Sequence, residues 1–231
     1  MNYHHPKSVF NIAAALHEKK FQLIFLCALF FAAGNNNAIA AFVTFNGDSA
    51  AESNWQLAAG NTILENFESY SEGTKISSLP TLGISFDLLA GGGYPQAYSF
   101  GGTPHGPMHL GNFPNGINAI NQYDDIVLHV LPGYAITALG FWNGDGQSDT
   151  LIATAYDASN NILGSVGSFK GTFAGFVSDV AISRVVFGGN TGDGWNHLDG
   201  LQTNASIVPV PAASWLFLSG IIGLLRYRRR S

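Results

Sequence analysis

Cysteine is nearly absent from this chain, which has a single one, Cys27, among 231 residues. Cys27 lies in the first apolar segment, so the residues from Phe42 onward contain none. A disulfide framework and a thiolate metal site are therefore excluded there, and the fold must depend on a hydrophobic core. A stretch of about 165 residues is long enough to bury one.

Charged residues are also scarce, at 11% of the chain, which is too few for a coiled coil. Between Phe42 and Val208 only Lys75, Lys170 and Arg184 oppose 14 carboxylates, so this segment has a formal charge of −11. An acidic surface repels phosphate backbones, and we therefore expect no nucleic-acid partner.

Helical periodicity is missing from most of the chain. Short apolar runs alternate with Gly, Asn, Asp and Pro, and 28 glycines and 17 phenylalanines favour strands and turns. The pattern predicts an all-β domain over residues 41–205, an antiparallel β-sandwich of jelly-roll-like type. The one short segment with helical character is Ala50 to Ala59.

Several strands can be placed from the sequence. Alternation predicts strands at Ile126–Val130 and Ala135–Trp142. The turn residues Asp157–Asn161 predict a hairpin between the strands on either side of them. We expect a last pair between Ile182–Gly188 and the segment around residues 197–202, and long loops, suited to binding, at Gly91–Gly116.

The N-terminus has the pattern of a secretory signal peptide over residues 1–40. Lys19 and Lys20 precede a 14-residue apolar run, and Ala38 and Ala40 occupy positions −3 and −1 before a cleavage site at Ala41. The alternative, a buried or membrane-anchoring helix, is disfavoured because about 20 apolar residues are needed to span a bilayer. We therefore expect the secretion translocon to export the chain.

The C-terminus, residues 206–231, combines prolines, an apolar run and arginines. Pro209 and Pro211 prevent a continuous helix before the apolar residues 212–225. A transmembrane helix over 212–225 would leave the arginines in the cytoplasm and the domain outside. The alternative, a core helix with a basic tail, does not explain why the helix is apolar on all sides.

This C-terminal segment resembles the PEP-CTERM sorting signal. The residues that carry the resemblance are Val208, Pro209, Pro211, Ala212, Ala213, Trp215, Arg226, Arg228, Arg229 and Arg230. The resemblance implies an exosortase-type membrane protease as a partner, cleavage near the prolines, and release to the cell surface or extracellular matrix.

Two further segments, Thr62–Phe86 and Val185–Leu201, resemble the first and last strands of jelly-roll domains that recur among PEP-CTERM proteins. Such domains resemble carbohydrate-binding modules and often hold a structural calcium between these strands. The resemblance implies Glu68 and Asp199 as candidate calcium ligands. The alternative is that both are turn or capping residues, because calcium needs six to eight oxygen ligands.

Other side chains are candidates for metal or sugar binding. His105 and His109 are four residues apart, but Gly106 and Pro107 break any helix that would align them for zinc. Trp195 in a Gly-Asp-Gly-Trp turn is a candidate platform for a sugar ring, whereas we expect Trp142 in the core.

No catalytic residue is predicted, because the chain has no Gly-x-Ser-x-Gly motif and no evident pair of carboxylates across a cleft. Asp124 and Asp125 are adjacent and should point to opposite faces of a strand. We therefore expect a non-catalytic, exported surface or matrix protein whose sandwich either binds exopolysaccharide or simply fills the extracellular matrix. The alternatives are a secreted polysaccharide hydrolase or lyase and a membrane-tethered protein whose tail is never cut.

Overall fold

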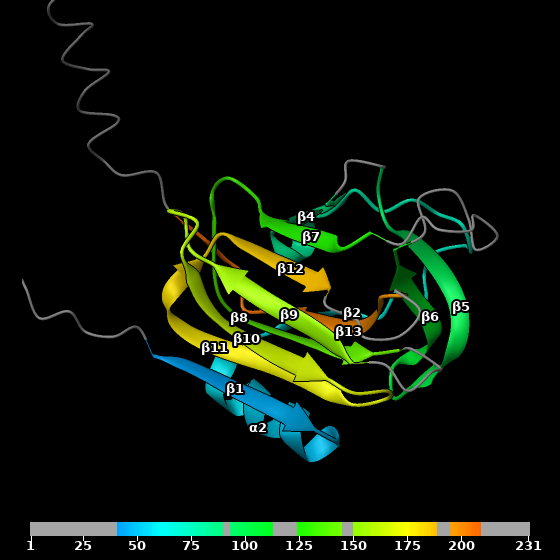
Figure 1. Ribbon diagram of the computed structural model, residues 1–231, viewed down its shortest axis with the longest axis horizontal. Helices are drawn as coiled ribbons and strands as arrows, with labels where there is room; N and C mark the ends of the chain where they lie inside the picture. The colour runs from blue at the N-terminus through cyan, green and yellow to red at the C-terminus, as the bar shows by residue number, and fades with distance from the viewer. Residues whose placement is uncertain (1–40, 90–92, 113–123, 145–149, 189–194, 209–231) are drawn as a thin grey trace, which may run out of the picture. The chain divides into compact units, whose positions relative to one another are not determined.

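The computed structural model describes residues 41–89, 93–112, 124–144, 150–188 and 195–208. These residues form two antiparallel β-sheets packed face to face, with one α-helix (Figure 1). The predicted all-β antiparallel sandwich is confirmed.

The first sheet has eight strands, and six of them form its main path. Their order is β1 (Phe42–Gly47), β11 (Phe173–Ile182), β8 (Tyr134–Asn143), β13 (His197–Thr203), β6 (Gly106–Gly111) and β5 (Gln96–Thr103). Off this path, β14 (Ser206–Ile207) pairs with β8, and β2 (Ile63–Glu65) pairs with β13.

The second sheet has six strands. Their order is β10 (Ile162–Ser168), β9 (Leu151–Tyr156), β12 (Arg184–Gly188), β7 (Ile126–Val130), β4 (Ile84–Leu88) and β3 (Ser78–Leu79), and a short 3-10 helix (Pro80–Leu82) lies between β3 and β4. Strands that are neighbours in one sheet are mostly far apart in the sequence, because the chain crosses repeatedly between the sheets.

The main core lies between the two sheets. Phe141 of β8 and Phe187 of β12 are fully buried, and their rings meet edge to face with centroids 5.1 Å apart. The predicted alternation on β8 holds, since Leu139 and Phe141 face this core while Trp142 packs on the opposite side of the sheet. The prediction that Trp142 is a core residue is confirmed.

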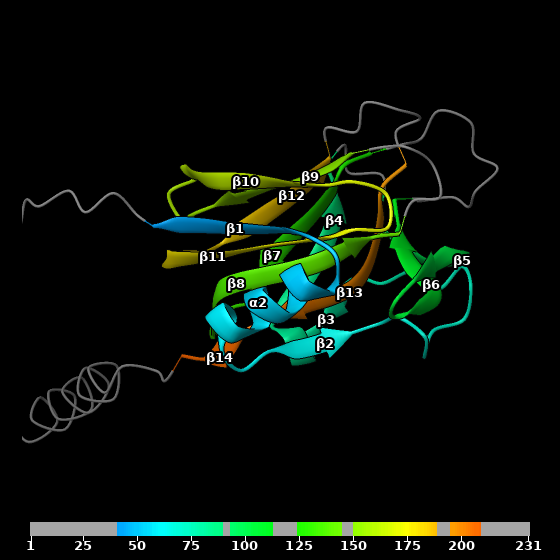
Figure 2. The ribbon, with the colours of Figure 1, turned by 90° about the horizontal axis from the view of Figure 1, so that it is seen from below.

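Helix α2 (Ser49–Ala59) covers the outer face of the eight-stranded sheet against β1, β11 and β8 (Figure 2). The Asp48 carboxylate caps its N-terminus by accepting a hydrogen bond from the Ala50 amide. Trp55 is fully buried beneath the helix and donates its indole N–H to the Phe176 carbonyl at 3.1 Å. Gly175 permits this close approach, because a Cβ there would lie 2.7 Å from the Trp55 ring.

The predicted hairpin between β9 and β10 is confirmed. One Asp157 carboxylate oxygen accepts hydrogen bonds at 2.8 Å from the amides of Ser159 and Asn161, and Asn160 has a left-handed backbone with φ of 64°. A short polar side chain that bonds to the backbone two residues later is the usual basis of such a turn.

Two predictions about strands are wrong. The expected pair between Ile182–Gly188 and the segment around 197–202 does not form, because β12 pairs with β7 and β9 while β13 pairs with β8, β6 and β2 in the other sheet. The segment Gly91–Gly116 contains the paired strands β5 and β6 rather than loops alone. Ala97, Met108 and Leu110 supply enough buried apolar surface to hold these strands on the core.

Among the residues that the structure describes, there is no helix that combines the length and the hydrophobicity needed to span a bilayer. The predicted signal segment 1–40 and transmembrane helix 212–225 lie outside those residues and stay predictions.

Candidate functional site

The outer face of the six-stranded sheet carries a small set of polar and aromatic side chains. On β9, the buried residues Leu151, Ala153 and Ala155 face the core, so the residues between them face outward. These outward residues are Ile152, Thr154 and Tyr156, all half-buried.

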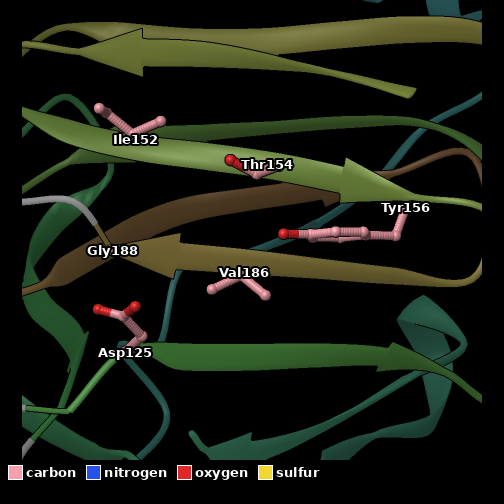
Figure 3. Close-up of a pocket in the computed structure, with 6 residues that line it drawn as sticks. All are labelled: Asp125, Ile152, Thr154, Tyr156, Val186 and Gly188. Carbon is pink, nitrogen blue, oxygen red and sulfur yellow. The ribbon is translucent and has the colours of Figure 1, made fainter. Parts of the chain in front are cut away.

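A pocket of about 310 Å³ lies on this face. It is lined by Asp125, Ile152, Thr154, Tyr156, Val186 and Gly188, which come from β9, β12 and the residue just before β7 (Figure 3). Register explains the grouping, because Thr154 is paired with Val186 and Ile152 with Gly188 across β9 and β12. The volume is at the lower end of the range of about 300 to 1,000 Å³ for small-molecule sites.

Tyr156 and Asp125 lie at opposite ends of the pocket (Figure 3). The Tyr156 hydroxyl points along the strands toward the middle of the pocket. The Arg184 guanidinium lies 4.0 Å from the Tyr156 ring centroid and donates a hydrogen bond to Asn160 Oδ1 at 2.6 Å. These contacts orient the ring, which leaves little rotamer freedom to be lost when a ligand binds.

Asp125 is half-buried, and burial raises the pKa of its carboxyl, with a smaller contribution from Asp124. Gly188 lies beside it, and a Cβ at Gly188 would overlap the carboxylate. Glycine at this position therefore keeps the carboxylate accessible from the pocket.

The pocket combines an apolar floor with polar groups at its edges. Val186 and Ile152 provide hydrocarbon surface, while Thr154, Tyr156 and Asp125 provide two hydroxyls and a carboxylate. Such a site can bind a small molecule that has an apolar face and hydroxyl or amine substituents. Asp125 is the one carboxylate among the lining residues, whereas glycoside hydrolysis ordinarily uses two.

The opposite sheet carries a second polar cluster, which joins α2 to β13 and to the turn between β5 and β6. His105 Nε2 lies 3.0 Å from Glu52 Oε1, and the Gln202 amide also donates to this oxygen. Gln56 donates to Gln202 Oε1 at 2.9 Å. We interpret this cluster as structural, because its members bond to one another.

Glu68 and Asp199, the calcium ligands implied by the resemblance, lie near this cluster. Glu68 follows β2, and its Oε1 accepts a hydrogen bond from the Met108 amide at 2.7 Å. Asp199 on β13 is fully buried, and its carboxylate accepts hydrogen bonds from the Thr103 hydroxyl and the Gly200 amide.

Burial raises the pKa of Asp199 to about 6, and nearby Glu68 adds to the rise. A cation would relieve the repulsion between the two carboxylates. The described part of the chain, however, has no group of three or more His, Cys, Asp or Glu side chains placed to hold a metal ion. Two carboxylates fall well short of a full calcium shell, so calcium binding stays a prediction.

His105 and His109 have different partners, since His105 lies against Glu52 and the ring of Trp142. His109 is buried on β6 and its ring centroid lies 5.9 Å from that of His197. Trp195, the predicted sugar platform, stacks on His197 with centroids 5.8 Å apart. It lies next to β13 of the eight-stranded sheet and is not part of the pocket, so no finding tests its predicted role.

The sorting residues from Pro209 to Arg230, together with Ala38 and Ala40, lie outside the described residues. Ala41 and Val208 border the domain. Ala41 is exposed and directly precedes β1, and the Val208 amide donates to the Gly133 carbonyl at 2.9 Å.

The sequence predicted neither Tyr156 nor Gly188 as a site residue. The pocket forms between strands that are neighbours only in the folded sheet, and sequence alone did not indicate that β9 and β12 pair. One signal was present: Ile152, Thr154 and Tyr156 alternate with small buried residues, which identifies an outward face.

No protein-family model and no curated protein matches the chain. Among solved structures, the K2 cleaved adhesin domain of Lys-gingipain is 14% identical, with a TM-score of 0.42, covering 62% of this chain and 99% of that one. A DUF4465 family protein from Bacteroides caccae is 15% identical, with a TM-score of 0.35 and the same coverage. A variant of a family 29 carbohydrate-binding module is 9% identical, with a TM-score of 0.28, covering 65% of this chain and 99% of that one. No TM-score here reaches 0.5, so the function proposed below rests on the pocket itself.

Proposed function

We propose that this chain is an exported cell-surface or matrix protein whose β-sandwich binds polysaccharide in the pocket on the six-stranded sheet. The observation that most directly supports this proposal is the arrangement of Tyr156, Thr154 and Asp125 around the apolar residues Val186 and Ile152. A sugar ring has an apolar face of C–H groups and an edge of hydroxyls, so it matches both parts of this lining.

Several finer features belong to the same proposal. The repeated crossing of the chain between sheets supports a jelly-roll-like topology. The residues at the two ends of the chain support export by the translocon and sorting by an exosortase-type protease. The single carboxylate in the pocket supports binding without catalysis.

A glycan array probed with the purified protein tests the binding proposal. Tyr156→Ala should weaken binding of any glycan that is found by about tenfold or more, because it removes the ring that forms one end of the pocket. Phe169→Ala is the matched control, since Phe169 is an exposed aromatic residue outside the lining. Equal binding by Tyr156→Ala and the wild type would contradict the proposal.

Gly188→Ala provides a second test that removes no polar group from the lining. Its added methyl group overlaps the Asp125 carboxylate and fills part of the pocket, so we expect at least tenfold weaker binding with little change in thermal unfolding. Gly167→Ala on β10 is the control, because its Cβ would meet only an ordinary contact at 3.4 Å from Thr150. A reducing-sugar assay on the bound glycan tests the alternative of a hydrolase, which would release new ends.

A further inference from the structure

Asp125 is the one charged side chain among the residues that line the pocket, and the protein compensates little of its charge. Within the described residues no hydrogen-bond donor reaches either of its oxygens, and its interacting neighbour is the like-charged Asp124. The Arg184 guanidinium packs on the ring of Tyr156, which lies at the other end of the pocket, and donates to Asn160. A half-buried carboxylate in this situation gains more from a cationic partner than from a neutral one.

The position of Asp125 makes this charge available to a ligand. Gly188 has no side chain to cover the carboxylate, and Asp125 contributes directly to the lining of the pocket. A ligand whose apolar face lies on Val186 and Ile152 therefore brings one of its edge substituents to Asp125.

The formal charge of the whole segment also favours a cationic ligand. Residues 42–208 carry a formal charge of −11, which attracts cationic ligands and repels polysaccharides rich in uronate or sulfate groups. The local and the overall fields thus select for the same sign of charge.

Resting on the proposed function, we infer that the pocket selects saccharides that carry a free, positively charged amine, and that Asp125 receives the ammonium group. An ammonium group donates hydrogen bonds to the carboxylate and also neutralises its charge, whereas a hydroxyl or an N-acetyl group does only the first. Asp125 is thus a specificity-determining residue, and Tyr156 with Thr154 provides contacts common to charged and neutral sugars.

Paired oligosaccharides that differ only in N-acetylation test this inference. Isothermal titration of the purified protein, near pH 7, would compare the β-1,4-linked trimer of glucosamine with the matching trimer of N-acetylglucosamine. We expect the free-amine trimer to bind about tenfold more tightly, which is the effect of one partly buried charge-assisted hydrogen bond. Raising the salt concentration should reduce this preference.

Two variants assign the preference to one residue. Asp125→Asn preserves the shape of the side chain and should bring the two trimers to within twofold of each other. Asp179→Asn removes the same charge from an exposed position on β11 of the other sheet, and it should retain the tenfold preference.

Each possible result of these titrations either supports or overturns the inference that Asp125 receives an ammonium group. Equal binding of the two trimers, binding of neither, tighter binding of the N-acetylated trimer, or a preference that persists in Asp125→Asn overturns the inference. In these cases the proposed function still stands if Tyr156→Ala weakens binding of a glycan found on the array by about tenfold or more, and it falls as well if no glycan depends on Tyr156.

Discussion

Single side chains on the two outer faces of the sandwich differ in how completely they are buried. On the eight-stranded sheet, His109, His197 and Asp199 are fully buried, whereas Tyr156 and Asp125 on the other sheet are half-exposed. Buried ionisable groups make stability depend on pH, while half-exposed ones are available to ligands.

The buried histidines should make the protein sensitive to acid. Burial lowers the pKa of His109 to about 4 and that of His197 to about 3, the latter also through His109. Unfolded histidine titrates near 6.5, so between pH 6.5 and 4 the unfolded chain takes up protons that the folded chain does not. Each histidine then lowers the free energy of unfolding by up to about 1.4 kcal/mol per pH unit of acidification.

Urea unfolding of the wild type and His109→Gln, at pH 7 and pH 5, measures this effect. We expect the variant to lose about 2 kcal/mol less than the wild type between the two pH values. Asp199 has the opposite effect on the free energy of unfolding. Its raised pKa of about 6 means that, as the pH falls, the folded chain takes up a proton before the unfolded chain does. Its contribution is common to both proteins and cancels in the comparison. An equal loss in the two proteins would show that His109 is not buried as a neutral group.

The calcium prediction also belongs to single residues. If Glu68 and Asp199 hold the ion, removing divalent cations with a chelator should lower the melting temperature, because a ligand that binds only the folded state stabilises it. Asp199→Ala should have a lowered melting temperature that no longer responds to chelator, while Asp179→Ala should respond as the wild type does. A wild-type melting curve unchanged by chelator would rule out the calcium.

At the scale of elements, α2 depends on one side chain. Trp55 packs with Phe173, Trp142 and Ala138 and satisfies its indole N–H at the Phe176 carbonyl. Trp55→Ala should lower the free energy of unfolding by about 3 to 5 kcal/mol, since it leaves a large cavity and removes the hydrogen bond to the Phe176 carbonyl. Leu57→Ala on the same helix is the control, because Leu57 is 83% exposed and should change stability by less than about 0.5 kcal/mol. Equal effects in chemical unfolding would contradict this role of Trp55.

Local sequence patterns predicted where the helix and the strands form better than they predicted which strands pair with one another. The helix at 50–59, the strands at 126–130 and 135–142, and the Asp157 hairpin follow from neighbouring residues, and all are present. The pairing of β12 with β9 and of β13 with β8 depends on which apolar faces meet across the core, and the alternation of either strand does not specify that. The pocket depends on the β9–β12 register, so the sequence revealed the outward face of β9 but not the site.

At the scale of the whole molecule, the sorting prediction concerns how the chain reaches the cell surface. The predicted transmembrane helix over 212–225 would be about 21 Å long, shorter than a bilayer core of roughly 30 Å, and such a length would suit a temporary anchor. In a host with an exosortase-type protease, mass spectrometry of the surface fraction should show a mature chain that ends near Pro211. A host strain that lacks the protease is the control and should retain the tail. Surface protein that still carries residues 224–231 in the intact host would contradict the sorting prediction.

The most direct test of the central claim is a map of where a bound glycan lies on the protein. Amide chemical shifts, followed by nuclear magnetic resonance during titration with a glycan found on the array, report this residue by residue. We predict that the largest changes fall on Ile152–Tyr156, Val186–Gly188 and Asp125, the residues around the pocket. Changes centred instead on Trp195 and His197, on the other sheet, or absent from β9 and β12, would contradict the account.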